Sequence, residues 1–407
     1  MTEETSNRVP ARWLRVCQLL MLAGLLTFFF ALFTGHAQRA WQAYLVNFVF
    51  WTGIAQCGVI FSAAYLVSKG QWGDTFRRMG ESLSFFLPVA LVLYLVLMLF
   101  GAKSVFPWAS HPVTGKEIWL SLPFVTLRGF VVLVAVFGLS VVYLYYSQRS
   151  PVYRAHAGGL IPDSGWIARW IRGAGTQEDE RRSEERLRLV APVLLIAFGL
   201  GFSLIGFDLV MSLDPHWYST LFGWYFFVSA FYATLAFLAV AGFFFRRAWA
   251  LDRHLNTDQT HDLGRLLFGF CLLTGGFFWT QWLVFWYGDL PEEIGPVIHR
   301  FYEMPFAPFA WTMTYGSFVV PLVVLLSKPL KRDPKKLMVI SIWILVMLWL
   351  ERYVWVVPAI WKGDGAPLAV EILITAGFLG GFLWGWIRHN QRLPLAAIST
   401  PATSVHD

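Results

Sequence analysis

The sequence is poor in charge. Only 14% of its 407 residues are Asp, Glu, Lys or Arg, whereas soluble domains average about 25%. Hydrophobic residues make up 57% of the chain and aromatic residues 18%, and the mean hydropathy is +0.55. These values exclude an ordinary soluble domain and predict an all-α polytopic membrane protein.

Cysteine is also scarce. Cys17, Cys57 and Cys271 all lie in apolar runs, and the sequence contains no C-x-x-C motif. A disulfide framework, a zinc site and an iron–sulfur cluster held by this chain alone are therefore not expected. The nine histidines lie in loops or near the ends of apolar runs, whereas a haem inside a helical bundle usually takes its axial ligands from within the helices. We therefore expect this chain to bind no cofactor of its own, so that any redox centre belongs to a diffusible molecule or a neighbouring subunit.

Apolar stretches of near the ~20 residues needed to cross the hydrocarbon recur along the chain. They predict about ten transmembrane helices, at 13–34, 44–68, 83–101, 121–147, 190–213, 219–245, 264–288, 306–327, 337–357 and 367–388. The first is long enough to span and is interpreted as a retained helix rather than a cleaved signal. The polar insert 148–189 is expected to be a solvated amphipathic helix or a flexible loop, with docking of a partner as the alternative.

The spans are expected to form two four-helix bundles with flanking helices. "KEIWLSLPFVTLRGF" and "RFYEMPFAPFAWTMTYG" are distantly alike, and each precedes the third helix of its unit. The predicted divisions are 1–43 for the N-terminal tail and first helix, 44–213 and 214–360 for the bundles, and 361–407 for the last helix and tail.

The distribution of Lys and Arg predicts the orientation. If the N-terminus is inside, the outer loops hold only Arg39, Lys103, Lys116, Arg300 and Lys362, and nearly all other basic residues lie in the inner segments. This bias places both termini in the cytoplasm of a bacterial inner-membrane protein. The net charge of +7 then reflects topology and contact with lipids, not a nucleic-acid-binding surface.

Five charged residues fall within the predicted spans: Arg128, Asp208, Glu351, Arg352 and Glu371. Counted at ~1.5 Å per residue, all lie in the outer half, and the inner halves are expected to carry almost no ionisable group. A charge in lipid is costly unless it is paired or wetted. Structural pairing of Arg128 with Asp208, and of Arg352 with Glu351 or Glu371, is one interpretation. The other is a cluster that transfers protons or lines a quinone-accessible cleft, because three carboxylates and two arginines leave one carboxylate without a partner.

The stretch "FDLVMSLDPHWYSTLFGWYFF", Phe207 to Phe227, joins the fifth and sixth spans on the outer side. Asp214 and His216 are expected at the mouth of the cluster. Asp214 could cap the sixth helix, with Pro215 at its first position and Ser219 as a competing cap. His216 could exchange protons near neutral pH. The outer loop 289–306 is expected to be solvated, to dock an outer subunit, or to wall the Asp208 region.

This junction, in a chain of ten spans, resembles the F-type membrane subunits (ActF) of bacterial alternative complex III, within the NrfD/polysulfide-reductase-like family. "WGDTFRRMGES", Trp72 to Ser82, is a weaker point of similarity. The resemblance implies two four-helix bundles with flanking helices. It also implies a quinol:electron-acceptor (cytochrome c) oxidoreductase complex, with a second NrfD-like subunit and with periplasmic iron–sulfur and haem c subunits as partners. Quinol is then a possible ligand, although the C-type subunit is the one associated with quinol oxidation.

The favoured interpretation is therefore a membrane subunit with a structural and proton-transfer role. Three alternatives stay open from the sequence. The chain could be the quinol-oxidising NrfD-like subunit itself, a purely structural scaffold, or a secondary transporter. The off-centre polar groups and the parallel repeats argue against a transporter, which often shows inverted repeats and helices broken at mid-depth.

Overall fold

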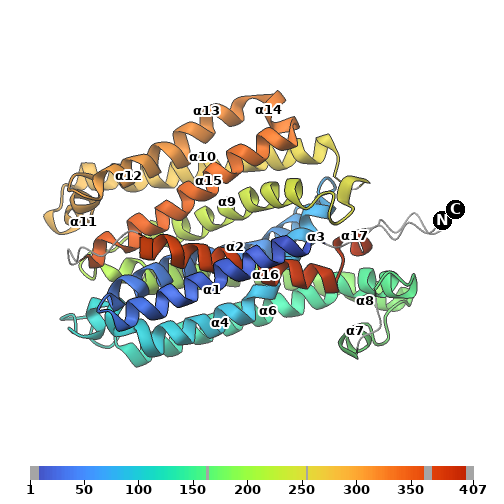
Figure 1. Ribbon diagram of the computed structural model, residues 1–407, viewed down its shortest axis with the longest axis horizontal. Helices are drawn as coiled ribbons and strands as arrows, with labels where there is room; N and C mark the ends of the chain where they lie inside the picture. The colour runs from blue at the N-terminus through green and yellow to red at the C-terminus, as the bar shows by residue number, and fades with distance from the viewer. Residues whose placement is uncertain (1–8, 162–164, 254, 362–368, 400–407) are drawn as a thin grey trace.

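The structure, a computed structural model, describes residues 9–161, 165–253, 255–361 and 369–399. These residues form helices joined by turns, with no strand among them (Figure 1). The predicted all-α fold is confirmed.

Ten helical segments are long and apolar enough to cross a membrane, as the sequence predicts. They are Ala11–Phe33 (α1), Ala37–Val67 (α2), Asp74–Val105 (α3 to α5), Leu122–Ala157 (α6), Gln177–Leu213 (α8 and a following turn), Thr220–Phe244 (α9), Thr257–Gly288 (α10), Ala307–Leu326 (α12 and α13), Pro334–Ile360 (α15 and a following turn) and Ala369–Arg392 (α16). Shorter helices outside these spans are α7 (Gly165–Trp170), α11 (Pro291–Phe301), α14 (Lys328–Arg332) and α17 (Leu395–Ile398).

The polar insert predicted at 148–189 is largely helical. Helix α6 continues to Ala157, and α8 already begins at Gln177. Thr176 caps α8, because its side-chain oxygen accepts a hydrogen bond from the backbone N–H of Asp179 at 3.1 Å. Three acidic residues occupy the first turn of α8, where negative charge is stabilised by the helix dipole. The charged run is therefore the exposed start of a spanning helix.

Helix α2 forms the centre of the molecule. Its most apolar 18-residue stretch is completely buried, and it packs against α8, α9, α15 and α16. Figure 1 shows α10, α12, α13 and α15 on one side of it and α4, α6 and α8 on the other. Helices α2 and α9 belong to different predicted bundles but pack against each other. The division of the chain into bundles 44–213 and 214–360 therefore stays a prediction.

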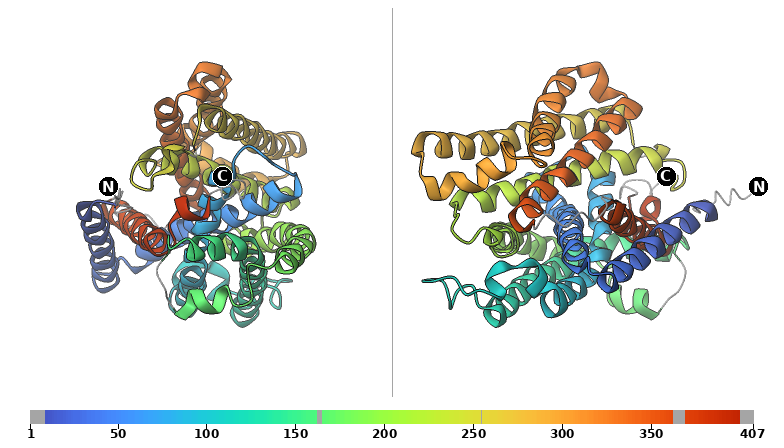
Figure 2. Two further views of the ribbon diagram at one scale, coloured as in Figure 1. Left: turned by 90° about the vertical axis from the view of Figure 1, so that its right-hand side faces the viewer. Right: turned by 60° about the vertical axis from the view of Figure 1, so that its left-hand side comes forward.

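Helix α1 lies at the edge of the molecule, beside α16 (Figure 2, left). Much of its surface is exposed. A side-chain carbon built on Gly24 would lie 2.5 Å from the Cα of Gly377, and one built on Gly380 would lie 2.5 Å from the carbonyl oxygen of Cys17. Only glycine permits this approach of two backbones, a common device between membrane helices.

Candidate functional site

Arg128 on α6 and Asp208 on α8 form the ion pair that the sequence predicts. The arginine Nε lies 2.9 Å from Oδ2 of Asp208, and Nη2 lies 2.6 Å from Oδ1. Asp208 is buried, and the guanidinium also lies over the ring of Trp119, 3.9 Å from its centroid. Two parallel hydrogen bonds fix the orientation of the two side chains relative to each other. The pair therefore joins the start of α6 to the end of α8.

Glu351 and Arg352 are neighbours on α15 and face α9. Nη1 of Arg352 lies 3.2 Å from Oε1 of Glu351, while its Nη2 donates to the carbonyl oxygen of Phe226 at 2.9 Å and to the hydroxyl of Ser229 at 2.6 Å. Glu351 is fully buried, and neither of its oxygens receives a hydrogen bond of good geometry. The hydroxyls of Tyr225 and Ser229 lie close enough to interact with it. The arginine is thus held more firmly than the carboxylate beside it.

Glu371 pairs with Arg39, not with Arg352. Nε of Arg39 lies 2.9 Å from Oε1 of Glu371, and both side chains are buried. The sequence placed Arg39 in an outer loop, but α2 begins at Ala37 and carries Arg39 into the protein interior. The guanidinium also lies 4.4 Å from the centroid of the Trp361 ring.

The five predicted charges therefore occupy three helix interfaces: α6 with α8, α9 with α15, and α2 with α16. Among the described residues, no hydrogen bond or ion pair joins one of these pairs to another. The structure brings each acid to an arginine but shows three pairs instead of one connected cluster.

The prediction that Asp214 caps the sixth helix is wrong. Helix α9 begins at Thr220, and the residue before it is Ser219. The carboxylate of Asp214 instead accepts a hydrogen bond from Nη2 of Arg300 at 2.5 Å. Asp214 therefore fastens the junction to α11 rather than capping α9. His216, also predicted at the mouth of the cluster, is exposed in the turn that precedes Trp217.

The outer loop 289–306 contains a helix, α11, which is tied to the end of α15. Arg300, near the end of α11, is 2% exposed. Its Nε donates to the carbonyl oxygen of Val354, and its Nη2 donates to that of Trp355, both at 3.1 Å. Together with the Asp214 contact, these bonds make Arg300 the residue that anchors segment 289–306. The sequence showed a solvated loop as one alternative, and the burial of Arg300 contradicts it at this residue.

A buried polar network at the opposite end of the molecule was missed. Glu81 on α3 is 0% exposed. Its carboxylate accepts hydrogen bonds from five side chains, Ser62, Arg77, Arg78, Ser147 and Gln148. Residues 69–82 were expected to be an inner loop, but α3 begins the third span at Asp74. The expectation that the inner halves carry almost no ionisable group is therefore wrong here. The spacing of Arg77 and Arg78 four and three residues before Glu81 was the available signal.

Two small cavities lie beside Tyr225, which lines both. The first, of about 20 Å³, is also bordered by Gln281 and by aromatic rings that include Phe278 and Trp355. The second, of about 10 Å³, is also bordered by Thr274, whose buried hydroxyl has no hydrogen-bond partner. Each is near the size of a single water molecule, which needs on the order of 10–15 Å³ measured this way. The hydroxyl of Ser219 donates to Oε1 of Gln281 at 2.6 Å, so the first cavity adjoins the junction before α9.

Within the described part of the chain, no group of three or more His, Cys, Asp or Glu side chains could hold a metal ion.

Comparison with protein families gives a match that covers most of the chain. Residues 32–362 match the family described as "Polysulphide reductase, NrfD". A search of curated protein sequences finds no match. The matched range contains the eight spans from α2 to α15. It also contains every arginine–carboxylate contact described above except that of Arg39, whose partner Glu371 lies beyond it. The chain therefore belongs to the NrfD polysulphide reductase family, whose members are membrane subunits of quinone-interacting oxidoreductase complexes.

Proposed function

We propose that this chain is the F-type membrane subunit of a respiratory quinol:cytochrome c oxidoreductase of the alternative complex III type, with a structural and proton-transfer role. Family membership and the sequence of the junction from Phe207 to Phe227 support this proposal. The chain would assemble in a bacterial inner membrane with a second NrfD-like subunit and with periplasmic iron–sulfur and haem c subunits. The family match favours this role over secondary transport.

The observation that carries the proton-transfer role is the setting of Glu351. Asp208 receives two short hydrogen bonds from one arginine, so both of its oxygens already have a partner. Glu351 is completely buried and receives no well-formed hydrogen bond. Arg352 makes two hydrogen bonds, to Phe226 and Ser229, that do not involve Glu351. Glu351 can thus gain or lose a proton without dismantling the contacts around it.

Tyr225 gives Glu351 a route toward the outer end of the helices. It lies close to Glu351 and lines both small cavities. A water in the cavity of about 20 Å³ would contact both Tyr225 and Gln281, and Gln281 is bonded to Ser219 at the junction. Protons released by quinol oxidation elsewhere in the complex would pass between Glu351 and the outer face along these groups.

The test is Glu351→Gln in the assembled complex. The substitution keeps the size of the side chain and removes its titration. We expect the rate of proton release to the outside after a quinol pulse to fall by roughly 100-fold, the lower end of what loss of a general acid–base group costs. Haem content and subunit stoichiometry should stay unchanged.

Glu117→Gln is the matched control. Glu117 is an exposed carboxylate that accepts a hydrogen bond from the backbone of Gly115, and its substitution should leave proton release as in the parent. If Glu351→Gln leaves both the amount and the rate of release unchanged in a fully assembled complex, the proton-transfer role is refuted.

A second candidate, direct binding of quinol, is favoured by one feature. An apolar groove of about 500 Å³ lies between α6 and the third span, lined by Leu95, Met98, Leu99, Leu122, Pro123, Thr126, Leu127 and Phe130. Its size and lining would suit an isoprenoid chain. Photolabelling by a quinone analogue that maps to α6 would support this candidate, and labelling confined to the second NrfD-like subunit would oppose it.

A further inference from the structure

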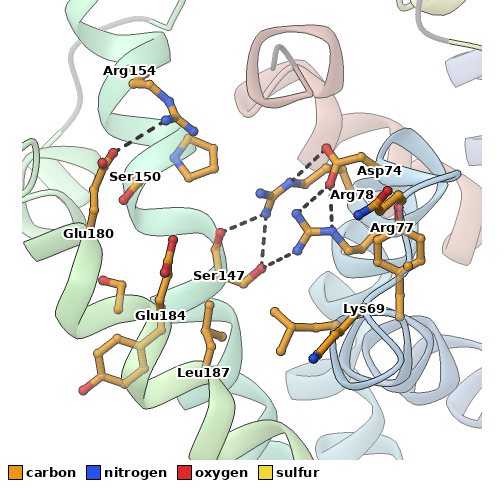
Figure 3. Close-up of a pocket in the computed structure, with 17 residues that line it drawn as sticks. Lys69, Asp74, Arg77, Arg78, Ser147, Ser150, Arg154, Glu180, Glu184 and Leu187 are labelled. Atoms are coloured by element: carbon orange, nitrogen blue, oxygen red, sulfur yellow. Dashed lines mark hydrogen bonds and ion pairs between the residues drawn. The ribbon is translucent and has the colours of Figure 1, made fainter. Parts of the chain in front are cut away.

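A polar pocket of about 640 Å³ opens at the end of the molecule opposite to the outer junction (Figure 3). It lies where α2 ends and α3 begins, against α6 and the first turns of α8. The bias of Lys and Arg predicts that this end faces the cytoplasm. The buried Glu81 network lies directly behind it, because Arg77, Arg78 and Ser147 belong to both.

The two sides of the pocket carry opposite charge. Lys69, Arg77 and Arg78 come from the end of α2 and the start of α3, and Glu180 and Glu184 come from α8. In Figure 3, Arg77 and Arg78 lie on one side of Ser147, which belongs to α6, and Glu180 and Glu184 lie on the other.

The basic side is preorganised. Arg77 is held by Asp74 at 2.7 Å, and Arg78 is held by Glu81 at 3.0 Å and by the carbonyl oxygen of Ser147 at 2.9 Å. Nε of Arg78 is buried without a hydrogen-bond partner. These contacts fix two guanidinium groups at the floor of the pocket and leave one donor group of Arg78 unused.

Two residues of the lining, one on each side, have no partner of their own. Within the described chain, the side chains of Lys69 and Glu184 make no ion pair or hydrogen bond, and both residues are exposed. Glu180 has only a loose, half-exposed contact of 3.5 Å with Arg154. The pocket therefore offers a free cation and a free anion at its opening.

The balance of basic and acidic residues around the pocket indicates which class of ligand it can bind. The lining and the network behind it hold four basic residues, Lys69, Arg77, Arg78 and Arg154, and four acidic residues, Asp74, Glu81, Glu180 and Glu184. A purely anionic group would meet the acids of α8 at close range. A group with both signs of charge can pair with both sides.

We propose that this pocket binds the headgroup of a zwitterionic aminophospholipid, with its phosphate toward Lys69 and Arg77 and its ammonium toward Glu180 and Glu184. An ammonium has three N–H donors for carboxylates, whereas a trimethylated choline has none. Leu66 and Leu187 also line the pocket and give the glycerol and the first part of the acyl chains an apolar surface. This inference concerns a site separate from Glu351 and does not depend on the proton-transfer role.

Native mass spectrometry of the purified complex tests the proposal. The complex is equilibrated in turn with phosphatidylethanolamine, phosphatidylcholine and phosphatidylglycerol, and the lipid retained on this subunit is counted. We expect phosphatidylethanolamine to be retained at least fivefold more than either other lipid. Glu184→Gln and Lys69→Gln should each abolish this preference, and both residues are exposed, so the fold should be unaffected.

Glu185→Gln is the control, because Glu185 is the next residue on α8 and does not line the pocket. It should retain the lipid as the parent does. Equal retention of the three lipids, or an unchanged preference in Glu184→Gln, would overturn the proposal. Displacement of the lipid by millimolar glycerophosphoethanolamine would show that a soluble zwitterion is sufficient and would overturn the assignment to a membrane lipid.

Discussion

At the residue scale, buried acids in this protein differ in how completely they are bound. Asp208 receives two bonds from one guanidinium, and Glu81 receives bonds from five side chains. Glu351 adjoins an arginine whose Nη2 bonds are directed elsewhere. Burying a charge costs free energy that pairing and hydrogen bonds must offset. The first two acids are thus suited to joining helices, and the third is suited to chemistry.

Removing one partner of the Arg128–Asp208 pair should destabilise the protein strongly. Asp208→Ala leaves a guanidinium with 9% exposure and no counter-charge. We expect a loss of about 3 kcal/mol in the free energy of unfolding, measured by SDS titration of the purified protein in micelles.

The double variant Arg128→Met with Asp208→Leu provides the comparison. It removes both charges and should recover most of the loss, because replacing a buried ion pair with apolar groups is often nearly neutral. A double variant as unstable as Asp208→Ala would show that the cost comes from packing and not from an unpaired charge.

At the scale of elements, α1 is held to the rest of the molecule by a glycine contact with α16. Gly24→Leu would place a side chain where the backbone of Gly377 now lies, 2.5 Å away. We expect a loss of about 2 kcal/mol, typical of overpacking, and partial separation of α1. A lower thermal midpoint in detergent, together with faster proteolysis between α1 and α2, would report it.

Gly199→Leu on α8 is the matched control. A side chain there has nothing within 4 Å, so the thermal midpoint should stay within the error of the parent. If both variants were equally stable, the close approach of α1 and α16 would not contribute to stability.

The spanning helices could be predicted from the sequence because apolar length alone identifies them in a membrane protein. The helix ends that adjoin polar segments could not be predicted in this way. Asp74 to Ser82 looks like a loop when hydropathy is the only guide, yet these residues are helical and surround the buried Glu81. The same holds for Arg39, whose burial depends on Glu371, distant in sequence.

Pairing within the site was predictable only where one partner was available. Arg128 and Asp208 were the sole charges of their helices within the predicted spans, and they meet. Glu371 had an alternative partner outside the spans, in Arg39, and the sequence could not choose between them. Asp214 was a plausible cap by residue type, but Arg300 on a distant segment uses its carboxylate.

For the whole molecule, the orientation in the membrane stays a prediction that fusions can test. The bias of Lys and Arg places both termini and the segment around Gly175 inside, and the segment around Lys116 outside. Alkaline phosphatase fused after Lys116 should be active, and fused after Gly175 it should be inactive. A green fluorescent protein at the C-terminus should fluoresce. The opposite pattern of enzyme activity would reverse the assignment of every inner and outer group.

The burial of α2 has a consequence for biosynthesis. This helix is second in the chain, yet the helices that enclose it, α8, α9, α15 and α16, are made later. Until later segments are made, Arg39 lacks Glu371, Gln42 lacks the carbonyl oxygen of Ile360 and Gln56 lacks Ser140. The mean hydropathy of the most apolar stretch of α2, 1.5, is also below that of both flanking spans, at 2.3 and 2.6. A newly inserted α2 would therefore be poorly matched to lipid. An insertase or chaperone that shelters it during translation would determine how much of this protein reaches its folded state.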